Sequence, residues 1–181
     1  MSQQKILITV PAHTDLRLRS IDQNDIENLR NWKNANKQSF FLNQDITPEQ
    51  QANWYRNFSA REHDHMFIVE QWHEGAWQSI GCMGFRKLDE EGCVDAYNII
   101  RAVKISPASF TMSEAFLLML AYAAKLYPGL PLEVKVLSHN PAVAWYQKNH
   151  FSIRNTTDNY HRMELDQTIL NNINWTVNNQ P

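Results

Sequence analysis

The stretch that decides the fold runs from Lys104 to Leu126 and reads KISPASFTMSEAFLLMLAYAAKL. Its apolar side chains recur at helical spacing: Met112, Ala115, Phe116, Met119, Ala123 and Leu126. This spacing predicts a helix over 112–126, which Pro128-Gly129 ends. Strand-like segments flank it, one ending at Val103 and one from Leu132 to Leu137. A helix between two strands of one sheet is a crossover, so we expect those strands to be parallel neighbours.

Downstream of this unit the sequence predicts one more helix and two strands. Asn140 can cap a helix whose first turn contains Pro141 and whose apolar face includes Tyr146. Short strands are expected at 151–153 and 160–165. Residues 167–181 are rich in Asn and weakly periodic, so we expect a mobile or loosely docked tail after a single domain over 1–166.

Upstream, the pattern changes to strands separated by turns. Strands predicted at 66–72, 77–88 and 93–103 form an antiparallel meander. Before them come a strand at 16–19 and two helices, which Asp22 and Thr47 can cap. The fold class is therefore α/β, with a mixed, mostly antiparallel sheet, one parallel strand pair and about four helices.

The composition bounds the class of function. The chain has 181 residues and a formal net charge of −2, which suits one globular domain and provides no basic field for nucleic acid. No stretch reaches the roughly 20 apolar residues that span a bilayer. The apolar run Ile6 to Val10 is too short for a signal peptide, so we expect a cytoplasmic protein with reduced thiols at Cys82 and Cys93. No metal-ligand spacing such as His-Glu-x-x-His occurs.

The start of the 112–126 helix is a candidate anion site. Backbone N–H groups and the positive end of the helix dipole would meet a phosphate there, and Thr111 and Ser113 can add hydroxyl donors. The alternative is that Ser109, Thr111 or Ser113 only caps the helix, which is the common role of such residues.

Two motifs carry a resemblance to a known family. The loop and helix just described, and Asn140 to Phe151 (NPAVAWYQKNHF), resemble the two CoA-facing motifs of GNAT acyltransferases. Asn31-Trp32, Ile46 to Glu49 with Trp54, and Tyr160 to Leu165 are similar to further parts of that family, so the likeness covers about 16–165. The resemblance implies a GNAT fold with a splayed parallel strand pair, and acetyl-CoA as co-substrate. It also implies transfer of an acetyl group to a primary amine of a small molecule.

The chain also departs from the family pattern. The family's diphosphate loop contains glycines, whereas residues 107–112 contain none. Pro107 and Glu114 are spaced as in the nucleotide-sugar N-acetyltransferases of pseudaminic-acid-type pathways, which favours an amino sugar or a nucleotide amino sugar as acceptor. His139 holds the usual Asn position and His150 replaces the common Gly. Alternatives are acetylation of a protein N-terminus or an aminoglycoside, and a GNAT-like binding domain that has lost catalysis.

The resemblance implies roles for individual residues. Tyr146 would be the general acid, with a core aromatic as the alternative. Independently of the resemblance, strand alternation places Asp95 on the same face as Tyr97, so Asp95 is a candidate base or a link to one through water, with an exposed strand-end carboxylate as the alternative. The base candidates His63, His65, His73 and His161 have no spacing that selects one. The CoA contacts would be Ile100, Arg101, Val103, Ser109, Phe110, Thr111, Met112, Ser113, Asn140 and Tyr146. The acceptor pocket would use Trp32, Phe40, Phe41, Trp54 and Tyr97, which would also make an ordinary core. The expected partners are a small-molecule amine and, in a homodimer, a second copy of the chain.

Overall fold

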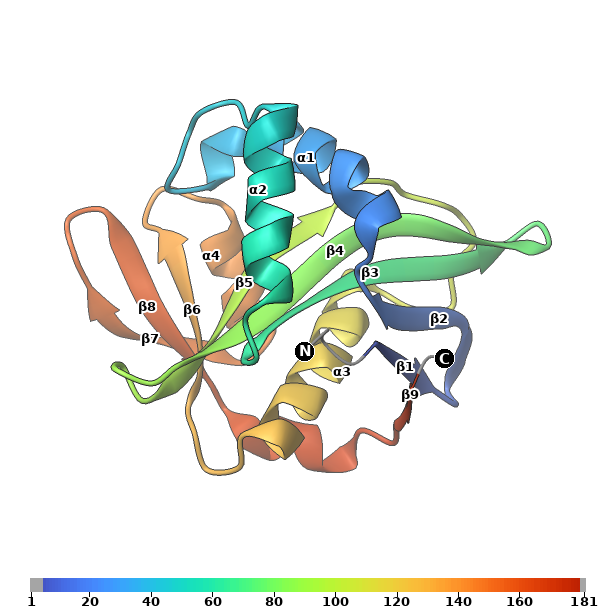
Figure 1. The fold of residues 1–181 in the computed structure, drawn as a ribbon. Helices are drawn as coiled ribbons and strands as arrows, with labels where there is room; N and C mark the ends of the chain where they lie inside the picture. Colours follow the sequence, from blue (N-terminus) through green and yellow to red (C-terminus); the bar gives the residue numbers. More distant parts are fainter. Residues whose placement is uncertain (1–4, 180–181) are drawn as a thin grey trace.

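A computed structural model describes residues 5–179, which form a nine-stranded sheet with helices on both faces (Figure 1). The strand order is β7-β8-β6-β5-β4-β3-β2-β1-β9. The strands are β1 (Ile6–Val10), β2 (His13–Ser20), β3 (Asp64–His73), β4 (Ala76–Leu88), β5 (Cys93–Arg101), β6 (Leu132–Leu137), β7 (Phe151–Thr156), β8 (Tyr160–Leu165) and β9 (Thr176–Asn179). The helices are α1 (Ile26–Ala35), α2 (Pro48–Ser59), α3 (Met112–Leu126) and α4 (Ala142–Lys148), with 3-10 turns η1 (Gln23–Asp25), η2 (Lys37–Ser39) and η3 (Gln167–Asn172).

Alternation along the strands builds a core on each face of the sheet. On β3, Phe67 and Val69 pack with α3 and α4, whereas Met66 and Ile68 pack with α1 and α2. All four side chains are at most 3% exposed. Figure 1 shows the same division, with α1 and α2 over one face and α3 on the other. The sheet is therefore buried on both sides, as in other α/β folds.

The central helix and the parallel pair agree with the sequence prediction. Helix α3 spans 112–126, and β5 and β6 are parallel neighbours on either side of it. Thr47 caps α2 in a capping box as expected, and Asp22 caps the 3-10 turn η1 that precedes α1, also in a capping box. Helix α4 begins at Ala142 because Asn140 and Pro141 lie in the turn before it. Within residues 5–179, β5–β6 is the one parallel pair of the sheet.

The parallel pair is short, and this opens the sheet. Strand β5 pairs with β6 over Val94–Ala96 only, while its later residues continue along β4. The β4–β5 register shifts between Cys82 and Gly84, and Asn98 has a positive φ of 52° opposite this shift. Glycine is needed nearby, because a Cβ on Gly81 would lie 2.2 Å from the Ile100 carbonyl oxygen. The bulge directs β5 away from β6, which leaves a gap between their ends.

The segment after Asp166 differs from the expected mobile or loosely docked tail. Residues 167–172 form η3, whose Leu170 is only 8% exposed, and 176–179 form β9, which pairs antiparallel with β1 at the sheet edge. Neither β1 nor β9 is among the strands predicted from the sequence, because residues 6–10 form only a short apolar run. Gln180 and Pro181 lie outside the described residues. No helix within 5–179 combines the length and apolarity that crossing a membrane requires.

Candidate active site

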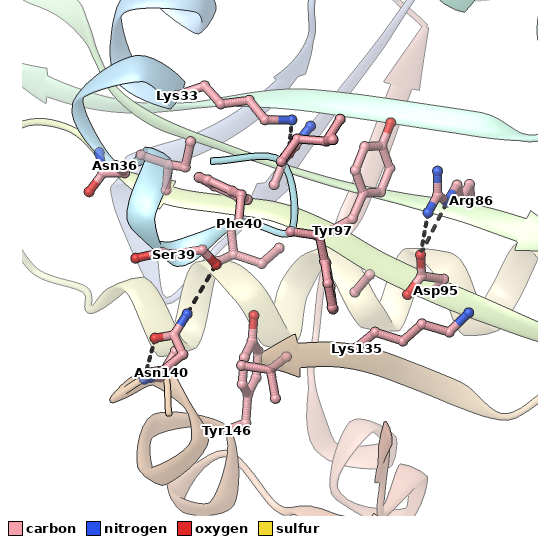
Figure 2. A pocket seen from close by; sticks show the side chains of 18 of the residues that line it. Lys33, Asn36, Ser39, Phe40, Arg86, Asp95, Tyr97, Lys135, Asn140 and Tyr146 are labelled. Carbon is pink, nitrogen blue, oxygen red and sulfur yellow. Dashed lines mark hydrogen bonds and ion pairs between the residues drawn. The ribbon is translucent and has the colours of Figure 1, made fainter. Parts of the chain in front are cut away.

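A pocket of about 550 Å³ lies where β5 and β6 part, between the α1–α2 segment and α4 (Figure 2). Side chains from both halves of the chain line it: Lys33, Asn36, Ser39, Phe40, Phe41, Leu42, Trp54, Arg61, Arg86, Asp95, Ala96, Tyr97, Asn98, Ile99, Ile100, Arg101, Lys135, Val136, Asn140, Ala142 and Tyr146. It is the size of a small-molecule site. We call it the main pocket.

Tyr146 projects from α4 toward the main pocket. Its ring packs against Phe116 and Phe151, with centroids 6.0 and 5.6 Å away, and the residue is 9% exposed. Its hydroxyl makes no hydrogen bond within residues 5–179 and points to the pocket in Figure 2. Burial, and secondarily the charge of Asp95, raises the pKa of this phenol. The ring belongs to the core, but its hydroxyl is not bonded to backbone as an ordinary core tyrosine would be.

Asp95 lies on β5 in the wall of the same pocket. It is 3% exposed, so the alternative of an exposed strand-end carboxylate is wrong. Arg86, its cross-strand neighbour on β4, donates to Oδ2 from Nε at 3.1 Å and from Nη2 at 2.9 Å. Burial raises the pKa of Asp95, and the Arg86 charge opposes that rise. Because both bonds go to Oδ2, Oδ1 accepts no hydrogen bond within the described residues.

Tyr97 makes the pocket wall beside Asp95. Its hydroxyl donates to Asp64, which also pairs with Arg61 at 3.1 Å. Burial and the Asp64 charge raise the pKa of Tyr97 well above its usual value. The Arg86 guanidinium lies 4.9 Å from the Tyr97 ring centroid. This hydroxyl is engaged in an ordered network, which suits a rigid wall.

The acceptor side of the pocket is aromatic, as expected, but differs in one residue. Phe40, Phe41 and Trp54 line it, whereas Trp32 packs into the core beneath α1 and does not. Lys33, next to Trp32, is present instead, with Nζ 3.1 Å from Asn98 Oδ1 and 5.1 Å from the Phe40 centroid. Burial lowers the pKa of Lys33.

Three residues that line the main pocket are not predicted from the sequence: Lys33, Arg86 and Asn98. A signal existed for Arg86, because the β4–β5 hairpin register places it opposite Asp95. Asn98 reaches the pocket through the bulge, which the alternation of strand residues does not reveal.

The strand and turn residues expected to contact CoA divide into two groups. Ile100 and Arg101 line the main pocket at the open side of β5, whereas Val103 lies outside it and is 43% exposed. Asn140 lines the pocket and bridges two elements: its Nδ2 donates to the Ser39 carbonyl at 3.2 Å and its Oδ1 accepts from Ala142 N at 2.9 Å. Backbone groups at a parted strand and a side-chain amide suit the amide-rich pantetheine arm of CoA.

The start of α3, the predicted diphosphate site, is internally bonded. Thr111 caps the helix by accepting from Glu114 N, and Glu114 Oε2 accepts from Thr111 N at 2.7 Å and Thr111 Oγ1 at 2.9 Å. Partial burial raises the pKa of Glu114, but the Thr111 hydrogen bonds and the His13 charge outweigh it and leave the pKa lowered. A carboxylate therefore occupies the positive end of the helix.

The loop before α3 is held in the same way. Asp15 accepts from the Ser109 backbone N at 2.9 Å and from its hydroxyl, while His13 lies 3.1 Å from Ser109 Oγ and 3.2 Å from Glu114. Phe110 and Met112 are buried in the core at 7% and 8% exposure. None of the residues 109–113 lines the main pocket. Capping, the alternative weighed from sequence, is what Thr111 does here.

The histidines considered as bases lie away from the main pocket. His63 and His65 contact the Tyr127 hydroxyl at 3.2 and 3.3 Å, and burial lowers the pKa of His65 to about 4. His73 contacts Glu74, and His161 contacts Thr156 Oγ1 at 3.0 Å. None of the four lines the pocket.

Together these features define a class: an α/β protein whose sheet opens at a parallel strand pair over a pocket with an unbonded phenol and a buried carboxylate. The sequence profile of the Acetyltransferase (GNAT) domain matches residues 15–152, and the chain belongs to this family. The resemblance drawn from sequence is thereby confirmed. No functionally curated protein matched the chain.

Solved structures share the fold at low identity. FdhC, described as a nucleotide-linked sugar GNAT, has a TM-score of 0.68 and 16% identity over 94% of this chain and 92% of its own. Spermidine N-acetyltransferase from Vibrio cholerae, solved with CoA and spermine, has a TM-score of 0.68 and 16% identity over 88% and 99%. A domain from Methanocaldococcus jannaschii DSM 2661 has a TM-score of 0.68 and 15% identity over 83% and 98%. These matches show the fold and leave the acceptor open.

Proposed function

We propose that the protein transfers an acetyl group from acetyl-CoA to a primary amine of a small molecule, with amino sugars and nucleotide amino sugars as the first acceptors to test. The observation that carries this proposal is the Tyr146 hydroxyl, which is buried, unbonded and directed to the main pocket at the opening of β5 and β6. A phenol in that position is a proton donor with no structural partner to hold it.

Each polar group of the pocket has a task in acetyl transfer. Acetyl-CoA supplies the activated acyl group as a thioester. Tyr146 delivers its proton to the departing thiolate, whose basicity is close to that of a phenol. Asp95 accepts the proton of the attacking amine through its unbonded Oδ1, directly or through one water, while Arg86 holds Oδ2. The raised pKa of Asp95 makes it a better base than an exposed carboxylate.

The fit to CoA is good at one end of the cofactor and poor at the other. Ile100, Arg101 and Asn140 suit the pantetheine arm, because β5 has no strand neighbour beyond Ala96 on the β6 side. At the α3 start the N–H groups of Met112 and Ser113 donate no hydrogen bond within the described residues, but the Glu114 carboxylate is close to them in the first turn. A diphosphate would meet that negative charge unless Glu114 turns away.

This charge favours one alternative function, a GNAT-shaped binding domain without catalysis. Titration calorimetry with acetyl-CoA and free CoA separates the two. Micromolar binding, roughly −8 kcal/mol, supports acetyl transfer and leads to an acceptor screen that starts with amino sugars. Folded protein that binds neither compound would rule out acetyl transfer and leave the binding domain.

A further inference from the structure

Beneath α1 and α2, next to the main pocket, lies a smaller cavity of about 180 Å³, which we call the inner cavity. Lys33, Leu42, Trp54, Asn98 and Ile100 line both spaces, so they are neighbouring parts of one cleft. The remaining wall of the inner cavity is apolar apart from Gln51. An acceptor whose amine reaches Tyr146 and Asp95 would extend toward this cavity.

Among the cations around the main pocket, Lys33 and Arg101 have no carboxylate partner within the described residues. Arg86 pairs with Asp95 at 2.9 Å and Lys135 with Glu91 at 2.7 Å, whereas Lys33 makes no ion pair within residues 5–179 and contacts the neutral Asn98 amide. Arg101 also lacks an ion pair there, but it is exposed to solvent. A partly buried ammonium without a counter-charge is costly, and a bound anion would neutralise it.

Gln51 provides a second polar group in the same cleft, an amide that faces the inner cavity without a protein partner among the described residues. The residue is 6% exposed, lines the inner cavity and makes no side-chain hydrogen bond within the described residues. Buried side-chain amides normally have partners, so its free state suggests that a ligand oxygen bonds there. Lys33 and Gln51 thus offer a cation and an amide donor to the same space.

We propose that Lys33 and Gln51 form the anion-recognition end of the acceptor site, and that the acceptor carries a carboxylate or phosphate group in addition to its amine. This inference rests on the proposed acetyl transfer and narrows its substrate class. It disfavours polyamine acceptors, whose additional positive charges would be placed beside Lys33.

The test is calorimetric titration of the full chain with three related amino sugars. D-glucosamine is the neutral-ring reference, D-glucosamine 6-phosphate carries a phosphate, and 2-amino-2-deoxy-D-glucuronic acid carries a carboxylate. We expect at least one acid to bind about tenfold more tightly than glucosamine, and which one does so identifies the anion. The preference should fall below about threefold in Lys33→Met and persist in Lys135→Met, because Lys135 lines the same pocket with its charge already paired.

Gln51→Leu keeps the apolar cavity and removes the amide, so it should weaken the preferred acid about threefold and leave glucosamine unchanged. The proposal is overturned if neither acid binds more tightly than glucosamine, or if Lys33→Met retains the preference. The acetyl-CoA titration tests the proposed function separately from the anion site. An acid preference without acetyl-CoA binding would establish the anion site and remove acetyl transfer.

Discussion

Helices α3 and α4 pack on the same face of the sheet, and the start of α3 differs from the pocket-facing side chain of α4 in its hydrogen bonding. At the start of α3, Thr111 and Glu114 bond each other, and Asp15 and His13 hold Ser109. At α4, Tyr146 is buried with an unbonded hydroxyl beside a pocket. This difference indicates different roles. The hydrogen bonds at the start of α3 stabilise the loop, whereas the Tyr146 hydroxyl is free to bond a ligand.

The largest expected effect is on turnover, at Tyr146. Tyr146→Phe should lower kcat by about 100-fold or more, since it removes the proton donor, while the acetyl-CoA Kd stays within about twofold. Steady-state kinetics with calorimetry checks both values. Tyr55→Phe, on α2 outside both cavities, is the matched control. Unchanged turnover in Tyr146→Phe would remove this residue from the mechanism.

The next effect concerns the pocket wall. Arg86→Met leaves the buried Asp95 without its partner and should lower the free energy of unfolding by about 2 kcal/mol, less than for a fully buried pair because the Arg86 side chain is 41% exposed. Urea denaturation measures it. Since burial raises the folded pKa of Asp95 above 3.8, the loss should be absent at pH values below 3.8 and grow as the pH rises through the folded pKa.

A double variant sharpens this prediction. Asp95→Asn added to Arg86→Met removes the uncompensated charge and should recover part of the lost stability. A double variant less stable than Arg86→Met would mean that Asp95 stabilises the fold through contacts other than Arg86.

At the start of α3 a smaller loss of stability is expected. Thr111→Ala removes the α3 cap and should cost about 1 kcal/mol in unfolding free energy. Ser113→Ala, at the second residue of the helix and with no cap bond, should change stability by less than about 0.5 kcal/mol. Equal effects of the two substitutions in urea denaturation would show that the capping box does not stabilise this helix start.

The smallest expected effect concerns the contribution of the α3 start to CoA binding. Glu114→Gln removes the negative charge at the α3 start and should tighten CoA binding about threefold by calorimetry. Weaker binding in the variant would mean that Glu114 shapes the loop for CoA.

The same variant has a pH signature. The lowered folded pKa of Glu114 gives stability that is present above pH 4.5 and lost as the pH falls through the folded pKa. Glu114→Gln should therefore lose less stability than the native chain between about pH 5 and 3. Identical acid profiles would show that Glu114 does not contribute.

The fold was predictable where the signal was local. Apolar spacing located α3, and a strand on each side of it made the parallel pair a topological consequence. The β1–β9 pairing joins segments from opposite ends of the described chain, so nothing in either segment alone indicates it. The centre of the sheet was therefore predictable from the sequence, and the β1–β9 edge was not.

The candidate site was also predictable only in part. The motif around Tyr146 identified the phenol, but whether its hydroxyl is bonded depends on tertiary packing. Lys33 and Gln51 stand out only because partners are missing around them, and a sequence does not show missing partners. Trp32 was selected for its ring, yet one helical step turns it into the core and presents Lys33 instead.

The position of β9 has a consequence for the nascent chain. Strand β1 is synthesised before β2 to β8, but the segment that covers its outer edge, 176–179, follows them. Throughout that interval the backbone donors and acceptors of β1 are open to pairing with other chains. Synthesis rate and chaperone supply should therefore affect the yield of this protein.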